Sequence, residues 1–318
     1  MGEGLFSGIF LPLTLVIIMM GVGLSLTLQS FRSIVLYPKA ILTGLFAQMA
    51  LLPMLAFFLA DRLELAPEYK VGLVIIAASP GGAASGLVNH LLRANVALSV
   101  SLTTLNSLLV VMSMPYLTGI ALERYMGDAV AIHLPFGRTV KDIALMTVAP
   151  ALLGVLIRRF RPVFCRKLEQ PLRYILPILL LLAFMGVIFI DKGQGTQPML
   201  QAKILVKPVL LLNLISMGLG YVLTRIMGLG NTSGLTIATE VGLQNSSLAI
   251  YVAQSLLGSG PMALVAVVYG TLTFSSTILM ALVIKWLDLQ SRRLARWVRI
   301  KPGQPPKHSG DPANSQED

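Results

Sequence analysis

The chain has 318 residues, of which 55% are hydrophobic and 12% charged, and its mean hydropathy is +0.78. A soluble domain carries roughly 25% charged residues, and no water-soluble fold can bury apolar runs on this scale. The formal net charge of +11 would suit nucleic acid binding, but the distribution of the basic residues along the chain favours another explanation, given below. The composition predicts an all-α polytopic membrane protein.

The rare residue types disfavour two classes of site. Cys165 is the only cysteine, which excludes a disulfide within the chain. His90, His133 and His308 lie far apart and form no HExxH motif, so a zinc hydrolase is not expected. Ser85 has only His90 as a nearby base, and no oxyanion-hole motif accompanies the pair. We therefore predict that the chain is not an enzyme and uses no cofactor.

Nine membrane spans are predicted when about 20 apolar residues are taken as the length that crosses the hydrocarbon core. The first segment has neither a basic n-region nor a small-residue cleavage site, so we expect a retained span and not a signal peptide. The spans lie near residues 5–27, 40–60, 71–92, 96–120, 139–157, 174–190, 204–225, 235–257 and 262–286.

The orientation follows from the Lys and Arg residues of alternate loops, because an odd number of spans places the termini on opposite faces. With the N-terminus outside, 17 of the 25 basic residues fall on the inner face and 8 on the outer face. The positive-inside rule thus predicts an outer N-terminus and a cytoplasmic C-terminus, in a cell or inner membrane. The basic excess then faces anionic lipid, and nucleic acid is not needed to explain it.

The C-terminal segment is predicted to leave the hydrocarbon core. Lys285–Ile300 places tryptophans and leucines among arginines, a pattern typical of a helix lying along the inner leaflet. The residues that follow are rich in Pro, Gly and polar side chains. We therefore assign residues 1–300 to one transmembrane domain and predict a disordered cytoplasmic tail over 301–318.

Two spans contain residues that a continuous helix avoids. In the third span, Pro80 removes a backbone donor while Gly81 and Gly82 leave nearby carbonyls free. The eighth span contains the polar run TEVGLQNSS over Thr239–Ser247, which would be costly against lipid. Both interruptions fall near the middle of the bilayer, so we predict two discontinuous helices.

The two interrupted spans occupy equivalent places in the chain and run in opposite directions. Each is third in a block of four, formed by spans 1–4 and 6–9, and the fifth span joins the blocks. This arrangement predicts an inverted repeat. Secondary transporters build a central site from such repeats, with broken helices that present free carbonyls and half-helix ends at the membrane midplane.

Glu240 is the only acidic residue placed well inside a predicted span. An ionised carboxylate there costs at least about 2.5–3.5 kcal/mol on insertion scales, and no basic residue lies in the neighbouring core segments. Glu240 is therefore either protonated or paired with a cation from solution. We favour a cation over a purely structural glutamate, because the nearby hydroxyls, amides and free carbonyls are the oxygen ligands that sodium prefers.

Several stretches resemble the bile acid:sodium symporter family, in order along the chain. They are MGVGLSL at 20–26, AQMALLP at 47–53, PGGAASG at 80–86, NVALSVSLTTLNSLL at 95–109 and EVGLQNSSLA at 240–249. The resemblance implies the nine-span form of that fold. It also implies a panel domain of spans 1, 5 and 6 and a core domain of spans 2, 3, 4, 7, 8 and 9, in which the two broken helices cross.

The same resemblance implies two sodium sites and a substrate cavity beside the crossing. The first sodium site would use Ser85, Ser99, Thr103 and Glu240, and the second Gln48, Glu240, Gln244 and the backbone carbonyls of Val241 and Leu243. The cavity would be faced by Ala83, Gly86 and Asn245, beside the break at Pro80, Gly81 and Gly82. The implied partners are Na⁺ as coupling ion, a small organic anion and the lipid bilayer, with no obligate protein partner evident.

Two positions depart from the family pattern. The family often has Asn after the Ser of the PGG segment, where it contributes to the first sodium site, and here that position is Gly86. A Thr is common near the substrate where this chain has Ala83. The first sodium site thus lacks one side-chain oxygen, and the cavity has fewer polar groups.

These observations predict a sodium-coupled symporter of a small or amphipathic organic anion that works by alternating access. A proton-coupled transporter is an alternative. In it Glu240 carries a proton in place of the sodium ion whose binding Gly86 weakens. An alternative of another class is a non-transporting membrane receptor or scaffold, which would tolerate loss of Glu240 with only a change in stability.

Overall fold

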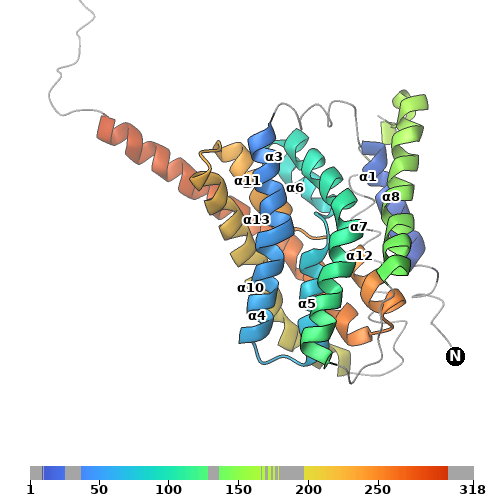
Figure 1. The fold of residues 1–318 in the computed structure, drawn as a ribbon. Helices are drawn as coiled ribbons and strands as arrows, with labels where there is room; N and C mark the ends of the chain where they lie inside the picture. The colour runs from blue at the N-terminus through green and yellow to red at the C-terminus, as the bar shows by residue number, and fades with distance from the viewer. Residues whose placement is uncertain are drawn as a thin grey trace, which may run out of the picture.

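The computed structural model of the chain is a bundle of helices (Figure 1), and it describes residues 9, 11–25, 37–127, 136–165, 167–168, 171–172, 175, 178 and 197–299. In these residues the only β-type pairing is one isolated bridge, which agrees with the predicted all-α class. With η marking π-helices, the elements in chain order are α1 (Leu11–Ser25), α3 (Pro38–Phe46), η2 (Ala47–Leu51), α4 (Leu52–Arg62), α5 (Pro67–Ala78), α6 (Ala83–Leu91), α7 (Val96–Met126), α8 (Phe136–Phe160), α10 (Gln197–Ile226), α11 (Asn231–Gly242), α12 (Ser246–Ile250), η4 (Tyr251–Leu256) and α13 (Gly260–Arg299).

Five helices in the described part of the chain are long and apolar enough to cross a membrane, and they match the second, fourth, fifth, seventh and ninth predicted spans. They are Pro38–Arg62, Val96–Met126, Gly137–Phe160, Gln201–Ile226 and Gly260–Gln290. The first predicted span contains a shorter apolar helix, and the third and eighth are each divided into shorter helices. The sixth predicted span, 174–190, lies almost wholly outside the described residues, so the number nine stays a prediction.

The helix of the ninth predicted span continues beyond the predicted end of that span. The segment from Lys285 was expected to form a helix of its own on the inner leaflet, but it continues α13 without interruption to Arg299. Between Gly270 and Pro302 the sequence contains neither Gly nor Pro, so nothing breaks the helix. In Figure 1 the red end of α13 extends beyond the rest of the bundle. The tail over 301–318 lies outside the described residues.

Helices α1 and α8 pack side by side at one edge of the bundle (Figure 1). A Cβ atom on Gly154 would lie 2.7 Å from the backbone nitrogen of Leu24, and one on Gly23 would lie 2.8 Å from the carbonyl carbon of Ala151. Small residues therefore allow the two backbones to approach closely. These helices correspond to two of the three expected panel spans. The third lies almost wholly outside the described residues, so the division into panel and core stays a prediction.

Helix α5 lies at the centre of the remaining helices, where it packs against α4, α7 and α13. Every residue from Val71 to Ala78 is buried, as expected for a helix that is apolar all round and surrounded by other helices. Pro67 at its first turn suits the helix start, because that position has no backbone hydrogen-bond partner for the missing N–H. The buried end of α5 leads directly into the first interruption.

Candidate functional site

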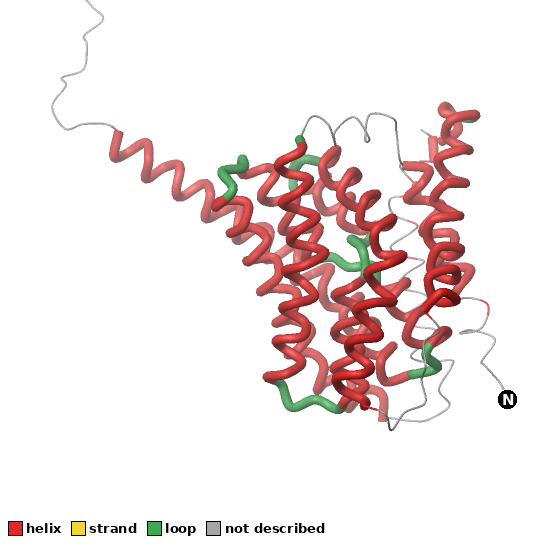
Figure 2. The backbone as a smooth tube through the Cα atoms, in the orientation of Figure 1, coloured by secondary structure: helices red, strands yellow, loops and turns green. Residues whose placement is uncertain are grey.

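The two predicted interruptions are present and meet inside the bundle. α5 ends at Ala78 and α6 begins at Ala83, while α11 ends at Gly242 and α12 begins at Ser246. Figure 2 shows loop segments between helices in the middle of the bundle. The second break is shorter than the polar run that predicted it, because Thr239–Gly242 remains helical.

Backbone hydrogen bonds join the two breaks directly. Gly81 and Gln244 form an antiparallel bridge. The N–H of Gly82 donates to the carbonyl of Leu243 at 2.8 Å, and the N–H of Asn245 donates to the carbonyl of Pro80 at 2.8 Å. Each break therefore satisfies backbone groups that the other leaves without a helical partner, which a membrane interior requires.

The glycine pair is needed for this approach. A Cβ atom on Gly82 would lie 2.9 Å from the backbone oxygen of Gln244, and one on Gly81 would collide with Oε2 of Glu240. In contrast, a Cβ on Gly86 would have no atom within 4 Å. Gly81 and Gly82 are thus required by packing, while Gly86 leaves open space beside the first turn of α6.

A carboxylate surrounded by hydroxyl groups lies next to the crossing. Glu240 on α11 is only 1% exposed. The hydroxyl of Ser85 on α6 donates to its Oε1 at 2.7 Å, and that of Thr103 on α7 donates to Oε2 at 2.9 Å. The hydroxyl of Ser99, also on α7, donates to Oε1. The four side chains predicted for the first sodium site therefore lie in direct contact.

The side chains predicted for the second site form an adjoining pair of amides. Nε2 of Gln48, in η2, donates to Oε1 of Gln244 at 2.6 Å and to the carbonyl of Ser79 at 2.9 Å. Nε2 of Gln244 donates to the carbonyl of Val241 at 2.6 Å. A π-helix often occurs at a functional position in a longer helix, and η2 sits inside the second predicted span with Gln48 facing the crossing. The side chains predicted for both sites are thus brought together, while the predicted Leu243 carbonyl accepts from the N–H of Gly82.

Sequence reasoning missed one member of this network, Asn89. It lies one turn after Ser85 on α6 and is fully buried. Its Nδ2 donates to the hydroxyl of Ser99 at 3.0 Å, and its Oδ1 accepts from the hydroxyl of Thr239 at 2.6 Å. Asn89 therefore links α6, α7 and α11. The signal that could have found it is its helical spacing from Ser85, which places both side chains on one face.

The C-terminal end of α11 accepts hydrogen bonds from polar side chains of α10 and α13. The carbonyl of Gly242 accepts from Nδ2 of Asn213 at 2.7 Å and from the hydroxyl of Tyr269 at 2.8 Å. The hydroxyl of Ser216 lies 3.4 Å from the carbonyl of Val241. Two donors on one carbonyl fix the position at which α11 stops, so the oxygen groups at the break are preorganised.

Asn245, which is predicted to face the substrate cavity, contacts residues of α12 and α1. Its Oδ1 caps α12 by accepting from the N–H of Leu248 at 3.1 Å, and its Nδ2 lies 3.8 Å from the sulfur of Met19 on α1. A thioether is a weak acceptor, so this amide N–H has spare capacity for a better one. Gly86 adds open space on α6, and Ala83 begins that helix.

The donor set consists of oxygen atoms and contains no thiolate or imidazole. In the described residues no cluster of three or more His, Cys, Asp or Glu side chains could hold a metal ion. The site instead offers one carboxylate, three hydroxyls, two amides and the carbonyls at the break. Such neutral oxygens around a single negative charge suit a hard monovalent cation better than a transition metal.

A family model and individual relatives both match this chain to sodium-coupled transporters. The model of the family described as sodium bile acid symporter family matches residues 12–197. A probable sodium/metabolite cotransporter from Arabidopsis thaliana, named BASS1, chloroplastic, is 32% identical over 248 residues, which are 77% of this chain and 59% of that protein. This chain therefore spans less than two thirds of that plant relative.

Two further relatives come from other kingdoms. An uncharacterized sodium-dependent transporter of Bacillus subtilis (strain 168), YocS, is 29% identical over 262 residues, covering 81% of this chain and 78% of that protein. The ileal sodium/bile acid cotransporter of Homo sapiens is 26% identical over 252 residues, covering 77% of this chain and 68% of that protein. The family match over residues 12–197 contains the first interruption, whereas Glu240 and the second interruption lie beyond its end.

Proposed function

The chain belongs to the sodium bile acid symporter family, and on that premise we propose that it is a sodium-coupled symporter of an organic anion. The family is one of transporters and not of enzymes, in agreement with the expectation from the sequence. Its apolar helices make the chain an integral membrane protein. We further propose that the N-terminus lies outside and the C-terminus in the cytoplasm, as the distribution of basic residues favours.

The observation that carries the proposal is the environment of Glu240. It is 1% exposed, and its contacts are the neutral hydroxyls of Ser85, Ser99 and Thr103. Neither of the ion pairs found in the described residues involves it. A buried carboxylate without a cation is costly. A sodium ion from solution would compensate the charge and find oxygen ligands already gathered around it.

The residues that would hold the ions are those of the two adjoining clusters. A first ion would be bound by Glu240 with Ser85, Ser99 and Thr103. A second ion would use Gln48, Gln244 and the backbone carbonyls of Val241 and Leu243, with Glu240 shared. Because Nε2 of Gln244 now donates to the Val241 carbonyl, this amide has to turn so that its oxygen meets the second ion.

Coupling would follow from the way the ions join the helices. The first cluster takes residues from α6, α7 and α11, and the second from η2 and α11, so bound sodium ties both broken helices to their neighbours. Asn245 and the space at Gly86 border the same crossing, so the substrate meets an ordered cavity only after the ions bind. The core would then move against the panel formed by α1, α8 and the sixth predicted span.

The substrate class we propose is a small or amphipathic organic anion. The N–H groups of Asn245 and the first turns of α6 and α12 would favour a carboxylate or sulfonate. The ileal relative is named as a bile acid cotransporter and the plant relative as a metabolite cotransporter. These names support the class of substrate and leave the individual molecule open.

The test is thermal unfolding of the purified protein in sodium chloride and in potassium chloride at matched ionic strength, for wild type and Glu240→Gln. Binding to the native state raises its stability by RT ln(1 + [L]/Kd). We expect a sodium-specific rise in Tm for the wild type that is lost in the variant. Absence of a sodium effect in wild type, with uptake into liposomes that is steep in pH, would instead indicate proton coupling through Glu240.

A further inference from the structure

Each hydroxyl group around Glu240 has one hydrogen, and in the structure that hydrogen can point at the carboxylate. The hydroxyls of Ser85, Ser99 and Thr103 all lie in hydrogen-bonding contact with it. To bind a cation together with Glu240, a hydroxyl must turn its hydrogen away and present a lone pair to the ion. Each of the three therefore needs a second acceptor for its hydrogen.

Two of the three hydroxyls have such an acceptor on their own backbone. Oγ of Ser85 lies 2.9 Å from the carbonyl of Gly82. Oγ1 of Thr103 lies 3.1 Å from the carbonyl of Ser99. These hydrogens can turn from Glu240 to a carbonyl that is already within reach, so Ser85 and Thr103 can become ion ligands without further rearrangement.

Ser99 differs from these two. Among the described residues, the hydrogen-bond contacts of its hydroxyl are Glu240 and Nδ2 of Asn89, and Nδ2 is itself a donor. Ser99 is fully buried, and so is Asn89. Of these two described contacts, Asn89 is the one that can accept the hydrogen in place of Glu240, provided that its amide turns to present Oδ1.

The surroundings of Asn89 allow that turn without leaving a polar group unsatisfied. Oδ1 now accepts from the hydroxyl of Thr239 at 2.6 Å. The same hydroxyl lies 2.9 Å from the carbonyl of Thr236 and 3.1 Å from that of Leu235, so its hydrogen has other acceptors. After the turn, Nδ2 of Asn89 can donate to the Thr239 oxygen, and every buried group keeps a partner.

We propose that Asn89 is a positioning residue for sodium binding, whose amide turns to accept the Ser99 hydrogen and so makes Ser99 an ion ligand. The inference rests on the proposed sodium-coupled function. It also gives α6 an amide at the first cluster despite Gly86, since Asn89 lies one turn further along the same helix. The Glu240 cluster then has two hydrogen-bond arrangements, one without the ion and one with it.

The first test is the sodium concentration that half-saturates the rise in Tm, measured for Asn89→Leu at ionic strength held constant with potassium chloride. Leucine is similar in size to asparagine and provides no acceptor. We expect the half-saturating sodium concentration to rise about tenfold, the effect of one lost hydrogen bond of favourable strength. Asn89→Ala removes the same amide without adding methyl groups, and we expect it to weaken sodium binding as well.

A double-mutant cycle with Ser99→Ala separates positioning from a structural role. If Asn89 acts through Ser99, Asn89→Leu no longer weakens sodium binding once the Ser99 hydroxyl is absent. Asn106→Leu is the matched control, because Asn106 is an equally buried amide on α7 with no hydrogen-bond partner among the described residues. We expect the control to leave the half-saturating sodium concentration unchanged.

The outcomes distinguish this inference from the proposed function. A wild-type protein without sodium-specific stabilisation overturns both. Sodium stabilisation of wild type that either Asn89 variant leaves at the same half-saturating concentration overturns the role of Asn89 alone. Equal effects of Asn89→Leu with and without the Ser99 hydroxyl overturn it too, since the two residues would then act independently.

Discussion

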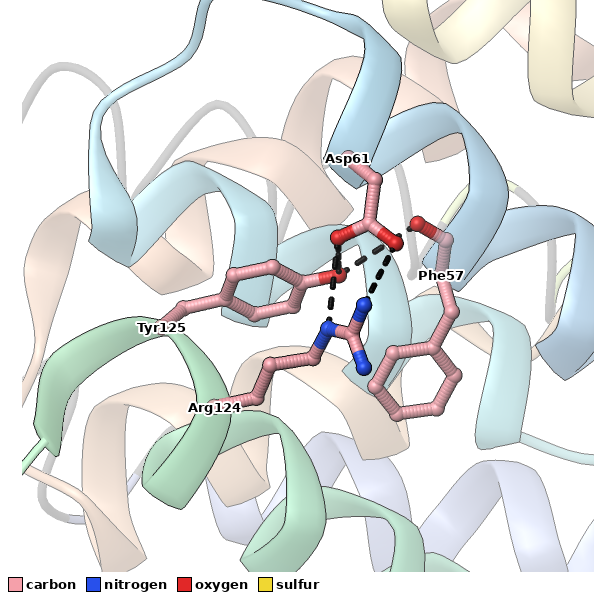
Figure 3. A network of polar contacts seen from close by, with 4 residues as sticks. All are labelled: Phe57, Asp61, Arg124 and Tyr125. Carbon is pink, nitrogen blue, oxygen red and sulfur yellow. Dashed lines mark hydrogen bonds and ion pairs between the residues drawn. The ribbon is translucent and has the colours of Figure 1, made fainter.

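Two polar networks that both take residues from the Pro38–Arg62 segment and from α7 differ in the surroundings of their carboxylate. Figure 3 shows the solvent-exposed network, called the outer network. In it Asp61 of α4 accepts from Nη2 of Arg124 at 2.8 Å and from the hydroxyl of Tyr125 at 2.9 Å. The Tyr125 hydroxyl also lies 3.3 Å from the carbonyl of Phe57. The Arg124 and Asp61 side chains are 56% and 38% exposed, so water can hydrate both charges.

The inner network contains Gln48, which precedes Asp61 in the same long apolar segment, and Ser99 and Thr103, which precede Arg124 on α7. There the carboxylate of Glu240 is buried, and its hydrogen-bond partners in the described part of the chain are hydroxyls. The exposed acid has its own cation, and the buried one has none within the described residues. Under the proposed function, burial and neutral oxygen partners mark the carboxylate that binds a cation from solution, while the exposed Asp61 forms an ion pair between two helices.

Replacing the buried acid should have the largest effect. For Glu240→Gln we expect sodium affinity, measured by the Tm rise, to fall by at least about 100-fold, because a charged oxygen ligand is exchanged for a neutral amide. In sodium-free solution the variant should be at least as stable as wild type, since a neutral amide costs less to bury. A variant that is less stable than wild type by the same amount with and without sodium would indicate a purely structural glutamate.

Closing the space between the two breaks should have the next largest effect. Gly82→Ala places a Cβ 2.9 Å from the backbone oxygen of Gln244, which cannot move without separating the breaks. We expect a loss of roughly 1–3 kcal/mol in unfolding free energy, as for other overpacked sites. The control is Gly86→Ala, where nothing lies within 4 Å of the new Cβ. Equal losses in denaturant unfolding would contradict the packing argument.

The same glycines show how much of the site could be predicted from sequence. Pro80, Gly81 and Gly82 predicted a break because their backbone effects are local. The second break was placed by polarity, which marks residues that must avoid lipid and does not mark where a helix ends. Its helix accordingly continues through Gly242, beyond the beginning of the polar run.

Residues that act through distant partners were harder to find. Asn89 is an ordinary polar residue in its local sequence, and its partner Thr239 lies 150 positions away along the chain. Gly242 is held by Asn213 and Tyr269 in the same way. The cluster around Glu240 was found because an intramembrane acid is unusual on its own and because the family resemblance supplied its neighbours. The contacts of Asn89 and Gly242 join residues far apart in the chain, and no local sequence pattern predicts such contacts.

Removing one of the two hydrogen bonds to the Gly242 carbonyl should have a moderate effect. Tyr269→Phe removes the hydroxyl that donates to the Gly242 carbonyl, while Asn213 continues to donate to it at 2.7 Å. We expect a loss of about 1 kcal/mol in unfolding free energy, the usual value of one buried hydrogen bond. Sodium affinity should change by no more than about threefold, because the carbonyl keeps one donor. Loss of sodium stabilisation would instead place Tyr269 within the ion site.

The smallest effect should come from the outer network. Asp61→Asn removes the charge that faces Arg124 and retains an acceptor for Tyr125, and exposed pairs of this kind contribute little. We expect Tm to fall by no more than about 2 °C, less at high salt, because mobile ions screen exposed charges. The half-saturating sodium concentration should stay at its wild-type value. If Asp61→Asn weakened sodium binding as Glu240→Gln does, the outer acid would also belong to the ion path, and exposure would no longer separate the two carboxylates.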